Sequence, residues 1–343
     1  GDAIARVRFA AQARTVAEKG ERIVRGLPSG GNHWTRTVRV GPDGNLYVSI
    51  GSSCNVCEEE DPRRAAIVRY DIQGGGETLY ATGLRNAVGF DWRPGTTELF
   101  ATDNGRDLLG DDFPPCELNR VVAGGFYGWP VANGDRVPDP DYGEGQEERI
   151  AASVPPVHGF GAHTAPLGIA FYDGTAFPER YRGAAFVALH GSWNRARKSG
   201  YEVVAVFFDE NGKASEEPFV TGFEIDEKVH GRPVDVAVGP DGALYVSDDY
   251  TGSIYRIAYG EGAGGRGAAA PAAGTPIGDP LAALTASERA TATTRGRALF
   301  DANGCAACHV AGRQTKGETY KPLEQLGSRY TIDSLARFLA APQ

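Results

Sequence analysis

The stretch Val40-Gly-Pro-Asp-Gly-Asn-Leu-Tyr-Val-Ser49 returns 198 residues later as Val238-Gly-Pro-Asp-Gly-Ala-Leu-Tyr-Val-Ser247. In each copy the proline presets a turn dihedral, the aspartate can bond its own backbone, and the glycine takes a conformation that other residues avoid. The Leu-Tyr-Val-Ser run that follows is rich in residues that favour strands. Each copy therefore predicts a turn that leads into a β-strand.

Weaker copies of this pattern lie between the two. Asp91-Trp-Arg-Pro-Gly95 leads into Glu98-Leu-Phe-Ala-Thr102, and Ile169-Ala-Phe-Tyr-Asp-Gly174 leads through an inserted loop into Ala184-Ala-Phe-Val-Ala188. Four steps across the 198-residue interval give roughly 50 residues for each step, which is the size of a propeller blade. We therefore expect an all-β propeller.

Composition and charge narrow the class of protein. The chain has 343 residues, of which 47 are Gly and 21 are Pro, so short strands and turns are favoured over long helices. The formal net charge of -9 argues against a nucleic-acid partner, because phosphate binding needs a basic surface. No run of 18 apolar residues occurs, so no transmembrane segment is expected.

A change of composition divides the chain into domains. Residues 260–280 are almost entirely Gly, Ala and Pro, a composition that cannot bury a core and is typical of a linker. Residues 1–259 form the predicted β-propeller domain, and residues 281–343 form a predicted small all-α domain. We expect the propeller to be truncated at its N-terminus and the small domain to be truncated at its C-terminus.

The small domain carries the motif Cys305-Ala-Ala-Cys308-His309, after a predicted helix over residues 287–300 that Ser287 caps. In this motif the two thiols form thioethers to the haem vinyl groups, and the histidine binds the iron as an axial ligand. The alternative, a thioredoxin-like redox pair, needs a βαβ context that this region lacks. The motif predicts a cytochrome c domain with haem c, whose sixth iron ligand the sequence does not identify.

The cysteines also indicate the compartment. Haem attachment to this motif normally takes place outside the bacterial cytoplasm, where disulfides persist, so we expect a periplasmic protein. Cys54 and Cys57 are expected to form a local disulfide, since no second Cys pair or His cluster supplies zinc ligands. For Cys116 three states stay open: free, paired with one of these two, or paired with a residue outside this sequence.

Polar residues gather at the predicted ends of strands and in the loops between them. In a propeller such positions converge from different blades on one mouth of the central channel, where a ligand binds. Taken singly, each is more often a surface or turn residue. The set comprises Asn32-His33-Trp34, Arg85-Asn86, Asp103-Asn-Gly-Arg-Asp107, Asp111-Asp112, Glu117-Leu-Asn119, His190-Gly-Ser-Trp-Asn-Arg195 and Arg232.

Several of these motifs resemble the PQQ-dependent sugar dehydrogenases, in particular the L-sorbosone dehydrogenase branch. The resemblance covers about residues 27–257 and rests on Asn32-His33, Thr82-Gly-Leu-Arg-Asn86, Gly124-Gly-Phe-Tyr-Gly-Trp-Pro130 and His190-Gly-Ser-Trp-Asn-Arg195. It implies a six-bladed β-propeller that holds pyrroloquinoline quinone (PQQ) and Ca²⁺ at its mouth. Many members of that family also carry a C-terminal cytochrome c.

The resemblance assigns roles to four residues around the quinone. His33 resembles the general base, whose alternative interpretation is an ordinary turn histidine. Arg85 and Asn86 resemble the groups at the C5 oxygen of the quinone, and Arg232 resembles a clamp for its carboxylates. Each of these roles is an expectation from the matched motif.

A second group of residues is expected to bind calcium. Gly105 and Arg106 match the family's two backbone carbonyls on Ca²⁺. Asp112 and Glu117 are further candidates, because carboxylates are preferred calcium ligands; solvated loop charge is the alternative for both.

The sequence departs from related glucose and aldose dehydrogenases at two places. Ala87-Val88 stand where those proteins have Pro-Gln, and Val234 stands where their second clamp arginine lies. Arg195 is the candidate for the lost contact, because a guanidinium can hold a carboxylate by two parallel hydrogen bonds.

These features predict a quinohaemoprotein oxidoreductase. It would oxidise a sugar or sugar aldehyde with PQQ and pass electrons through haem c to a cytochrome or quinone acceptor. One alternative is a calcium-dependent lactonase-type hydrolase, in which a fused haem has no role; another is a non-catalytic electron-transfer or binding module. The sequence does not decide which sugar is the substrate.

Overall fold

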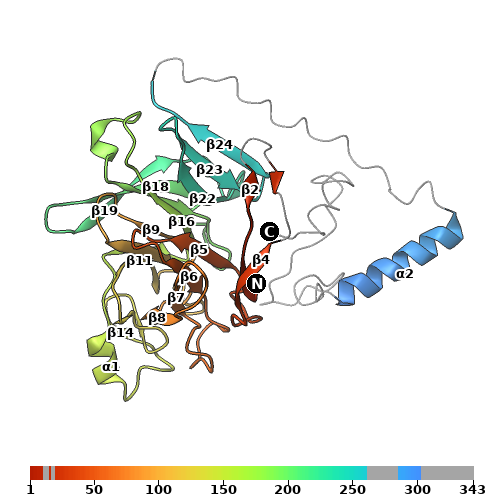
Figure 1. The fold of residues 1–343 in the computed structure, drawn as a ribbon, viewed down its shortest axis with the longest axis horizontal. Coiled ribbons are helices and arrows are strands. Elements are labelled where there is room, and N and C mark those ends of the chain that lie inside the picture. The colour runs from red at the N-terminus through yellow and green to blue at the C-terminus, as the bar shows by residue number, and fades with distance from the viewer. Residues whose placement is uncertain (11–14, 17–19, 261–284, 303–343) are drawn as a thin grey trace. The chain divides into compact units, whose positions relative to one another are not determined.

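The computed structural model describes residues 1–10, 15–16, 20–260 and 285–302. The chain divides into two units, Gly1–Gly260 and Glu261–Gln343. Strands predominate in the first unit, as the Gly- and Pro-rich sequence predicts (Figure 1).

The described part of the first unit contains four sheets of three or more strands. The first sheet contains β5 Arg36–Val40, β6 Leu46–Ile50, β7 Ala66–Tyr70, β8 Thr78–Thr82 and β12 Gly125–Phe126. The second contains β9 Phe90–Trp92, β10 Leu99–Asp103, β11 Pro115–Val121 and β15 His158–Ala162. The third contains β16 Pro166–Phe171, β17 Ala185–Leu189, β18 Glu202–Phe208 and β19 Ala214–Val220, and the fourth contains β22 Pro233–Val238, β23 Leu244–Asp248 and β24 Ser253–Ile257.

Strands that follow one another in each sheet pair antiparallel, and only β12 is parallel to its partner β8. Shorter elements lie between and before the sheets. They are β1 Ala3–Arg6 with β4 Glu21–Arg25, β2 Phe9–Ala10 with β3 Thr15–Val16, β13 Ala132–Asn133 with β14 Val137–Pro138, β20 Glu224–Ile225 with β21 Lys228–Val229, helix α1 Glu147–Ala152 and a 3-10 turn at Glu179–Tyr181.

Both full copies of the repeat form the turn and strand that they predict. Asp43 accepts the hydroxyl of Tyr47 at 3.0 Å, and Asp241 accepts the hydroxyl of Tyr245 at 3.2 Å. The glycine after each aspartate has a φ of +77° or +73°, a conformation that costs glycine little. The copies lead into β6 and β23, which occupy the same position in the first and fourth sheets.

The weaker copies lead into β10 and β17, so four copies mark four sheets. The expected division of the interval into four equal steps is wrong, because the structure shows three. The step between the second and third sheets is long, since β12, β13, β14 and α1 are inserted between β11 and β15.

Neighbouring sheets pack face to face in chain order, which is a propeller-like arrangement. The rings of Tyr47 and Trp92 lie 5.1 Å apart and join the first sheet to the second. Phe100 and Phe171 lie 5.3 Å apart and join the second sheet to the third. The Tyr172 hydroxyl donates to the Gly242 carbonyl at 3.0 Å between the third and fourth sheets. The number of six blades stays a prediction.

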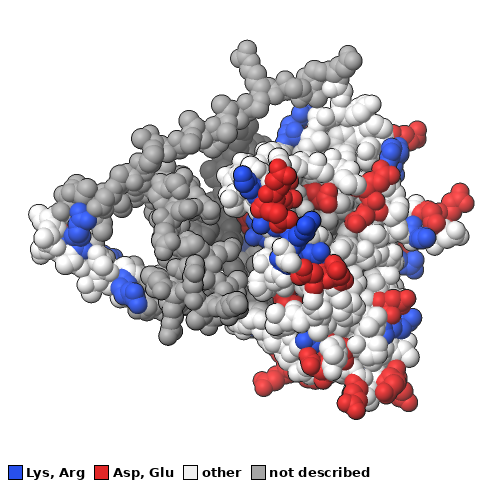
Figure 2. Space-filling view, turned by 180° about the vertical axis from the view of Figure 1, so that it is seen from behind, with Lys and Arg blue, Asp and Glu red and all other residues white. Residues whose placement is uncertain are grey.

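The antiparallel pairing decides where the loops lie. β5, β9, β16 and β22 begin at the end of the sheets where β6, β10, β17 and β23 finish. Loops from all four sheets therefore gather at this end. On the surface shown in Figure 2, acidic and basic side chains are interspersed over the described residues.

The second unit is described over one helix, α2 Ala286–Ala302. The predicted helix is confirmed, but the expected cap at Ser287 is wrong. The Thr285 hydroxyl accepts the amide of Glu288 at 3.3 Å, and the Glu288 carboxylate accepts the amide of Thr285 at 2.9 Å. This reciprocal pair is a capping box, and it begins the helix at Ala286 instead.

The haem motif, Cys305, Cys308 and His309, lies outside the described residues. Within the described residues, no helix is long and apolar enough to cross a membrane.

Candidate functional site

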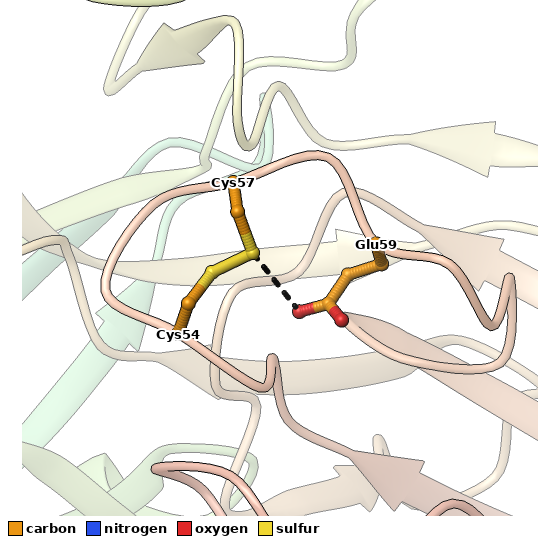
Figure 3. Close-up of side chains that lie close together, drawn as sticks. All are labelled: Cys54, Cys57 and Glu59. Carbon is orange, nitrogen blue, oxygen red and sulfur yellow. Dashed lines mark hydrogen bonds between the residues drawn. A yellow bond between two sulfur atoms is a disulfide. The ribbon is translucent and has the colours of Figure 1, made fainter.

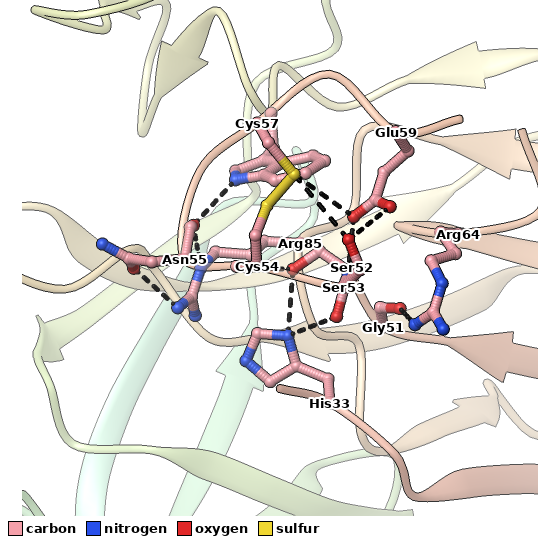
Figure 4. Close-up of a disulfide and its surroundings, with 11 residues drawn as sticks. His33, Gly51, Ser52, Ser53, Cys54, Asn55, Cys57, Glu59, Arg64 and Arg85 are labelled. Carbon is pink, nitrogen blue, oxygen red and sulfur yellow. Dashed lines mark hydrogen bonds between the residues drawn. A yellow bond between two sulfur atoms is a disulfide. The ribbon is translucent and has the colours of Figure 1, made fainter. Parts of the chain in front are cut away.

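The site lies at the end of the sheets where the loops gather. His33 precedes β5, Arg85 and Asn86 precede β9, and the loops after β6 and β10 face them. Figure 4 shows that His33 and Arg85 both lie beside the loop of residues 51–57. The segment around His33, the loop after β6, the turn before β9 and the loop after β10 thus form one polar cluster.

Arg85 is a buried cation of this cluster, with 5% of its surface exposed. Its Nε and Nη2 donate to the carbonyl and side-chain oxygens of Asn55, both at 2.9 Å. Its Nη1 donates to the carbonyls of Asn104 at 3.1 Å and Gly105 at 3.0 Å. Its Nη2 also donates to the Asp107 carboxylate at 3.1 Å. All five N–H donors of a guanidinium are therefore engaged with protein oxygens, and a bond to a ligand needs the exchange of one of them.

His33 is held in one tautomer by Ser52. Its Nδ1 lies 3.0 Å from the Ser52 carbonyl and 2.9 Å from the Ser52 hydroxyl. That hydroxyl donates its own hydrogen to the carbonyl of Cys54 at 2.7 Å, and a carbonyl has only lone pairs to offer. Nδ1 must therefore carry the hydrogen, which leaves the lone pair on Nε2.

The surroundings of His33 favour the neutral ring. Burial is the largest cause, and the positive charge of Arg85 is the next; together they lower the pKa of His33 from 6.5 to about 4. Arg64 and Arg36 add smaller contributions in the same direction, against the bond to Ser52. At neutral pH the side chain is thus an uncharged base, with the Nε2 lone pair able to accept a proton.

Asn86 and His33 approach each other across Gly51. A Cβ atom at Gly51 would lie 2.5 Å from the Cβ of His33 and 2.7 Å from the Asn86 side-chain oxygen. Only glycine leaves room for both side chains, so this position is part of the site. The backbone amide of Asn86 donates to the Asp103 carboxylate at 2.6 Å, and this bond fixes the turn before β9.

Two buried carboxylates face each other at the end of the second sheet. Asp103 on β10 and Glu117 on β11 are register partners, and both line a cavity of about 20 Å³. Burial raises the pKa of Asp103 to about 7. Burial and then the neighbouring Asp103 raise the pKa of Glu117 to about 8. A cavity of this size admits one water molecule or one ion.

In the part of the chain that the structure describes, the hydrogen bonds around Glu117 leave one neighbouring buried oxygen without a partner. Its two oxygens accept the Asn119 side-chain amide and the Gly134 backbone amide, both at 2.9 Å. The side-chain oxygen of Asn119 is buried and lacks a hydrogen-bond partner among the described residues. Asn119 does not line the cavity, so the oxygens that fit a cation there are those of Asp103 and Glu117, since oxygen atoms are the ligands that calcium prefers.

The other residues expected to bind calcium lie in different surroundings. Gly105 and Arg106 line the same cavity, although the Gly105 carbonyl already accepts Arg85. The Arg106 guanidinium is buried and donates to both oxygens of Asp139 at 2.7 and 2.8 Å. Asp112 does not line the cavity, and its side chain is 93% exposed.

The two expected clamp arginines lie near the third and fourth sheets. Arg195 pairs with Asp112 at 3.2 Å, and its other guanidinium nitrogens donate to backbone carbonyls. Arg232 donates to the carbonyls of His190 at 3.2 Å and Gly191 at 2.8 Å. The structure thus brings Arg195 and Asp112 together, and it separates Asp112 from the buried carboxylates.

Cys54 and Cys57 form a disulfide, as the sequence predicts, and Cys116 is free and buried. Figure 3 shows the carboxylate of Glu59 beside the sulfur of Cys57, 3.8 Å away. The three side chains have the proximity of a metal site, but bonded sulfurs cannot serve as thiolate ligands. The pair is therefore a structural feature of the loop.

Sequence reasoning missed three residues of the cluster: Asn55, Ser52 and His163. Asn55 contacts Arg85, Ser52 orients His33, and the buried His163 lies 3.8 Å from Asp107. The only signal for Asn55 was its place between two cysteines. Its contacts depend on loops from other sheets, which no local pattern encodes.

The fold is a propeller-like β-domain with a cluster of polar side chains at one end. The chain matches the family Glucose / Sorbosone dehydrogenase over residues 1–256, and it matches cytochrome c over residues 293–343. The first match covers most of the chain, so this protein belongs to the glucose/sorbosone dehydrogenase family.

Two related proteins each match about two thirds of the chain. An uncharacterized protein of Borreliella burgdorferi is 35% identical over 233 residues, which cover 66% of this chain and 61% of that protein. The aldose sugar dehydrogenase YliI of Escherichia coli is 25% identical over 259 residues, which cover 68% of this chain and 63% of that protein. The chain thus spans about six-tenths of the length of these relatives.

Solved structures share the fold. The calcium structure of the Trichoderma reesei family AA12 enzyme is 24% identical, with a TM-score of 0.63 and coverage of 74% of this chain and 75% of that one. The holo PQQ domain of the Coprinopsis cinerea pyranose dehydrogenase is 23% identical, with a TM-score of 0.63 and coverage of 75% and 77%.

Proposed function

We propose that this chain is a quinohaemoprotein oxidoreductase that oxidises a sugar or sugar aldehyde with PQQ and passes the electrons to a covalently bound haem c. The single observation that carries the proposal is the placement of His33, oriented by Ser52, and the buried Arg85 beside one loop in a domain of the glucose/sorbosone dehydrogenase family. The match to cytochrome c in the same chain supports it, since a tethered haem serves redox chemistry and has no role in hydrolysis.

The residues present fit the two groups that the family implies. For a cation, the buried carboxylates of Asp103 and Glu117 are register partners that line one cavity and form an oxygen-rich site. For PQQ, which is anionic, His33 and Asn86 lie close together at Gly51, with the positive charge of Arg85 close by. PQQ in such a site would accept a hydride from the substrate carbon.

His33 would act as the general base. Its Nε2 lone pair is available, because Ser52 keeps the hydrogen on Nδ1. The base would accept the proton of the substrate hydroxyl while hydride leaves the same carbon. Arg85 would supply positive charge near the developing oxyanion and keep His33 neutral at working pH.

Further residues would hold the cofactors at this end of the sheets. Asn86 would bind a quinone oxygen, and Arg195 and Arg232 would contact carboxylates through their guanidinium groups. Glu117, with the carbonyls of Gly105 and Arg106, would bind Ca²⁺. A role for the exposed Asp112 is the weakest of these proposals, because it lies outside the cavity.

In the second unit, Cys305 and Cys308 would bind the haem covalently and His309 would ligate its iron. A haem takes one electron at a time, which matches the stepwise reoxidation of a two-electron donor. A cytochrome or quinone would then accept the electrons. The disulfide and the c-type haem motif both favour a periplasmic location.

The test is a single spectrum of the haem. Purified chain is mixed with an aldose or a sugar aldehyde, with and without PQQ and Ca²⁺. We expect haem reduction only when both are added. Haem that stays oxidised with every substrate would contradict the proposal, and release of acid from a lactone without PQQ would favour the lactonase alternative.

A further inference from the structure

The Cys54–Cys57 disulfide closes a small ring in the loop after β6, and the chain segment inside this ring contacts the site. The ring contains Asn55 and Val56 and lies between Ile50 at the end of β6 and Ala66 at the start of β7. Figure 4 shows the disulfide between Glu59 on one side and Arg85 on the other.

Asn55 makes more contacts across the site than any neighbour in its ring. Its carbonyl accepts Nε of Arg85 at 2.9 Å and the indole N–H of Trp129 at 3.3 Å. Its side-chain oxygen accepts Nη2 of Arg85 at 2.9 Å and the amide of Asp107 at 2.8 Å. Its side-chain amide donates to the Asp107 carbonyl at 3.1 Å.

These bonds decide where Arg85 lies. Two of its five donors bind Asn55, and a third binds Asp107, which Asn55 itself holds. Because the guanidinium is buried, a lost protein partner is costly to replace, and a shift of Asn55 would move Arg85 or weaken the bonds that satisfy its charge.

The position of Asn55 depends in turn on the ring. Ser52 donates to the Cys54 carbonyl at 2.7 Å on one side, and Glu59 accepts the hydroxyl of Ser53 at 2.8 Å. The disulfide joins both ends of the short segment and removes most of its conformational freedom. Both cysteines are partly exposed, so a soluble reductant can reach them.

We propose that Asn55, held in the ring closed by the Cys54–Cys57 disulfide, is the positioning residue for Arg85, so that the site is ordered in the disulfide form and loosened in the dithiol form. A dithiol reductant would break the one S–S bond. It would deliver two electrons and two protons, become a disulfide itself, and leave two cysteine thiols in the loop. The expected effect on turnover rests on the proposed function. The expected effect on the order of the loop and of Arg85 does not.

The first experiment measures order without cofactors. Hydrogen exchange is followed by mass spectrometry on the full chain, oxidised, and after reduction with a dithiol and anaerobic desalting. We expect exchange at the Asp107 amide to rise about tenfold on reduction, since its acceptor is the Asn55 side chain. Peptides of β18 and β19, which lie far along the chain, serve as the internal reference.

Variants distinguish the effect of the disulfide from the effect of the Asn55 side chain. Asn55→Ala and the double variant Cys54→Ser/Cys57→Ser should show the fast exchange without reductant. Asn55→Asp keeps the acceptor oxygen and should fall between Asn55→Ala and the parent. Val56→Ala is the matched control from the same ring, and it should behave as the parent does.

The second experiment measures turnover of the chain loaded with PQQ and Ca²⁺. We expect kcat to fall at least about tenfold in the Asn55→Ala and double-serine variants, with KM within about twofold, because Arg85 acts at the cofactor. Reoxidation should restore the parent but not the double-serine variant.

Equal exchange at Asp107 in the oxidised and reduced parent would overturn the proposal, whatever the activity. Equal kcat in the parent and Asn55→Ala would overturn the positioning role. A parent that never turns over contradicts the proposed function instead, and the exchange data then still decide whether the ring holds Asn55.

Discussion

The most direct test of the site is the protonation of His33 as the pH is lowered. Below its pKa a histidine base carries a proton on both nitrogens and can no longer accept one. Burial and the charge of Arg85 lower the pKa of His33 to about 4. We therefore expect the acid limb of kcat/KM, which reports the free enzyme, to lie near pH 4 rather than near pH 6.5.

The size of the effect follows from the shift. A change from 6.5 to about 4 corresponds to about 3 kcal/mol between the two protonation states. At pH 5 about nine-tenths of His33 would be neutral, against about 3% for an unperturbed histidine. The direction of the His33 pKa shift also determines how stability depends on pH. The unfolded chain binds the proton first as the pH falls below 6.5, so the contribution of His33 to stability is present above this pH and declines towards pH 4.

The assay is an NMR titration of the chain without cofactors, from pH 7.5 to the lowest pH at which it stays folded. His33→Ala identifies the resonance that belongs to this ring. Long-range ¹H–¹⁵N spectra show which nitrogen carries the hydrogen, and we expect Nδ1, since Ser52 accepts there. The chemical shifts should stay constant down to about pH 5.

Two results would refute the reasoning. A midpoint near 6.5 would show that Arg85 and burial do not act on this ring as the geometry requires. A hydrogen on Nε2 would contradict the tautomer inferred from Ser52 and remove the lone pair that the proposed base needs.

Four further outcomes are expected. In the loaded enzyme His33→Ala should lower kcat by about 10² to 10⁴-fold while PQQ binding, measured by fluorescence quenching, is retained; a loss within about threefold would exclude the base role. EDTA should abolish activity and Ca²⁺ restore it, and calorimetry should show weaker Ca²⁺ binding in Glu117→Gln; unchanged affinity in that variant would exclude Glu117 as a ligand. Because the pKa values of Asp103 and Glu117 are raised to about 7 and about 8, Ca²⁺ binding should release protons and strengthen as the pH rises through this range, and pH-independent binding would argue against this pair. Cys305→Ala/Cys308→Ala should lack covalent haem on a denaturing gel while its quinone-dependent dye reduction persists; haem that stays attached would contradict the motif.

Much of the fold could be predicted from local sequence. The Gly-Pro-Asp-Gly turns act within a few residues, as the bonds of Asp43 and Asp241 show, so both strands were predicted at their places. The helix in the second unit was predicted too, but its cap was misassigned because Thr285 and Ser287 are equally suited to that role by type. Only the partner Glu288, three residues after Thr285, distinguishes them.

The spacing of the sheets could not be predicted in the same way. Dividing the interval evenly gave one step too many, since the insertion between β11 and β15 carries no repeat of its own. Loop length has little energetic cost, so evolution can lengthen one connection without disturbing the sheets.

By itself, the sequence determined the turn and strand repeat, the linker composition, the Cys-x-x-Cys-His motif and the close spacing that favours a disulfide between Cys54 and Cys57. All of these depend on residues that are neighbours along the chain. The tertiary structure decided which polar residues act together. Arg85 is held by Asn55, 30 residues away, and Asp103 meets Glu117 only because β10 and β11 pair in register. Burial, which sets the charge of His33, Asp103 and Glu117, is likewise a property of the packed sheets, because it depends on side chains that the loops and neighbouring strands bring together.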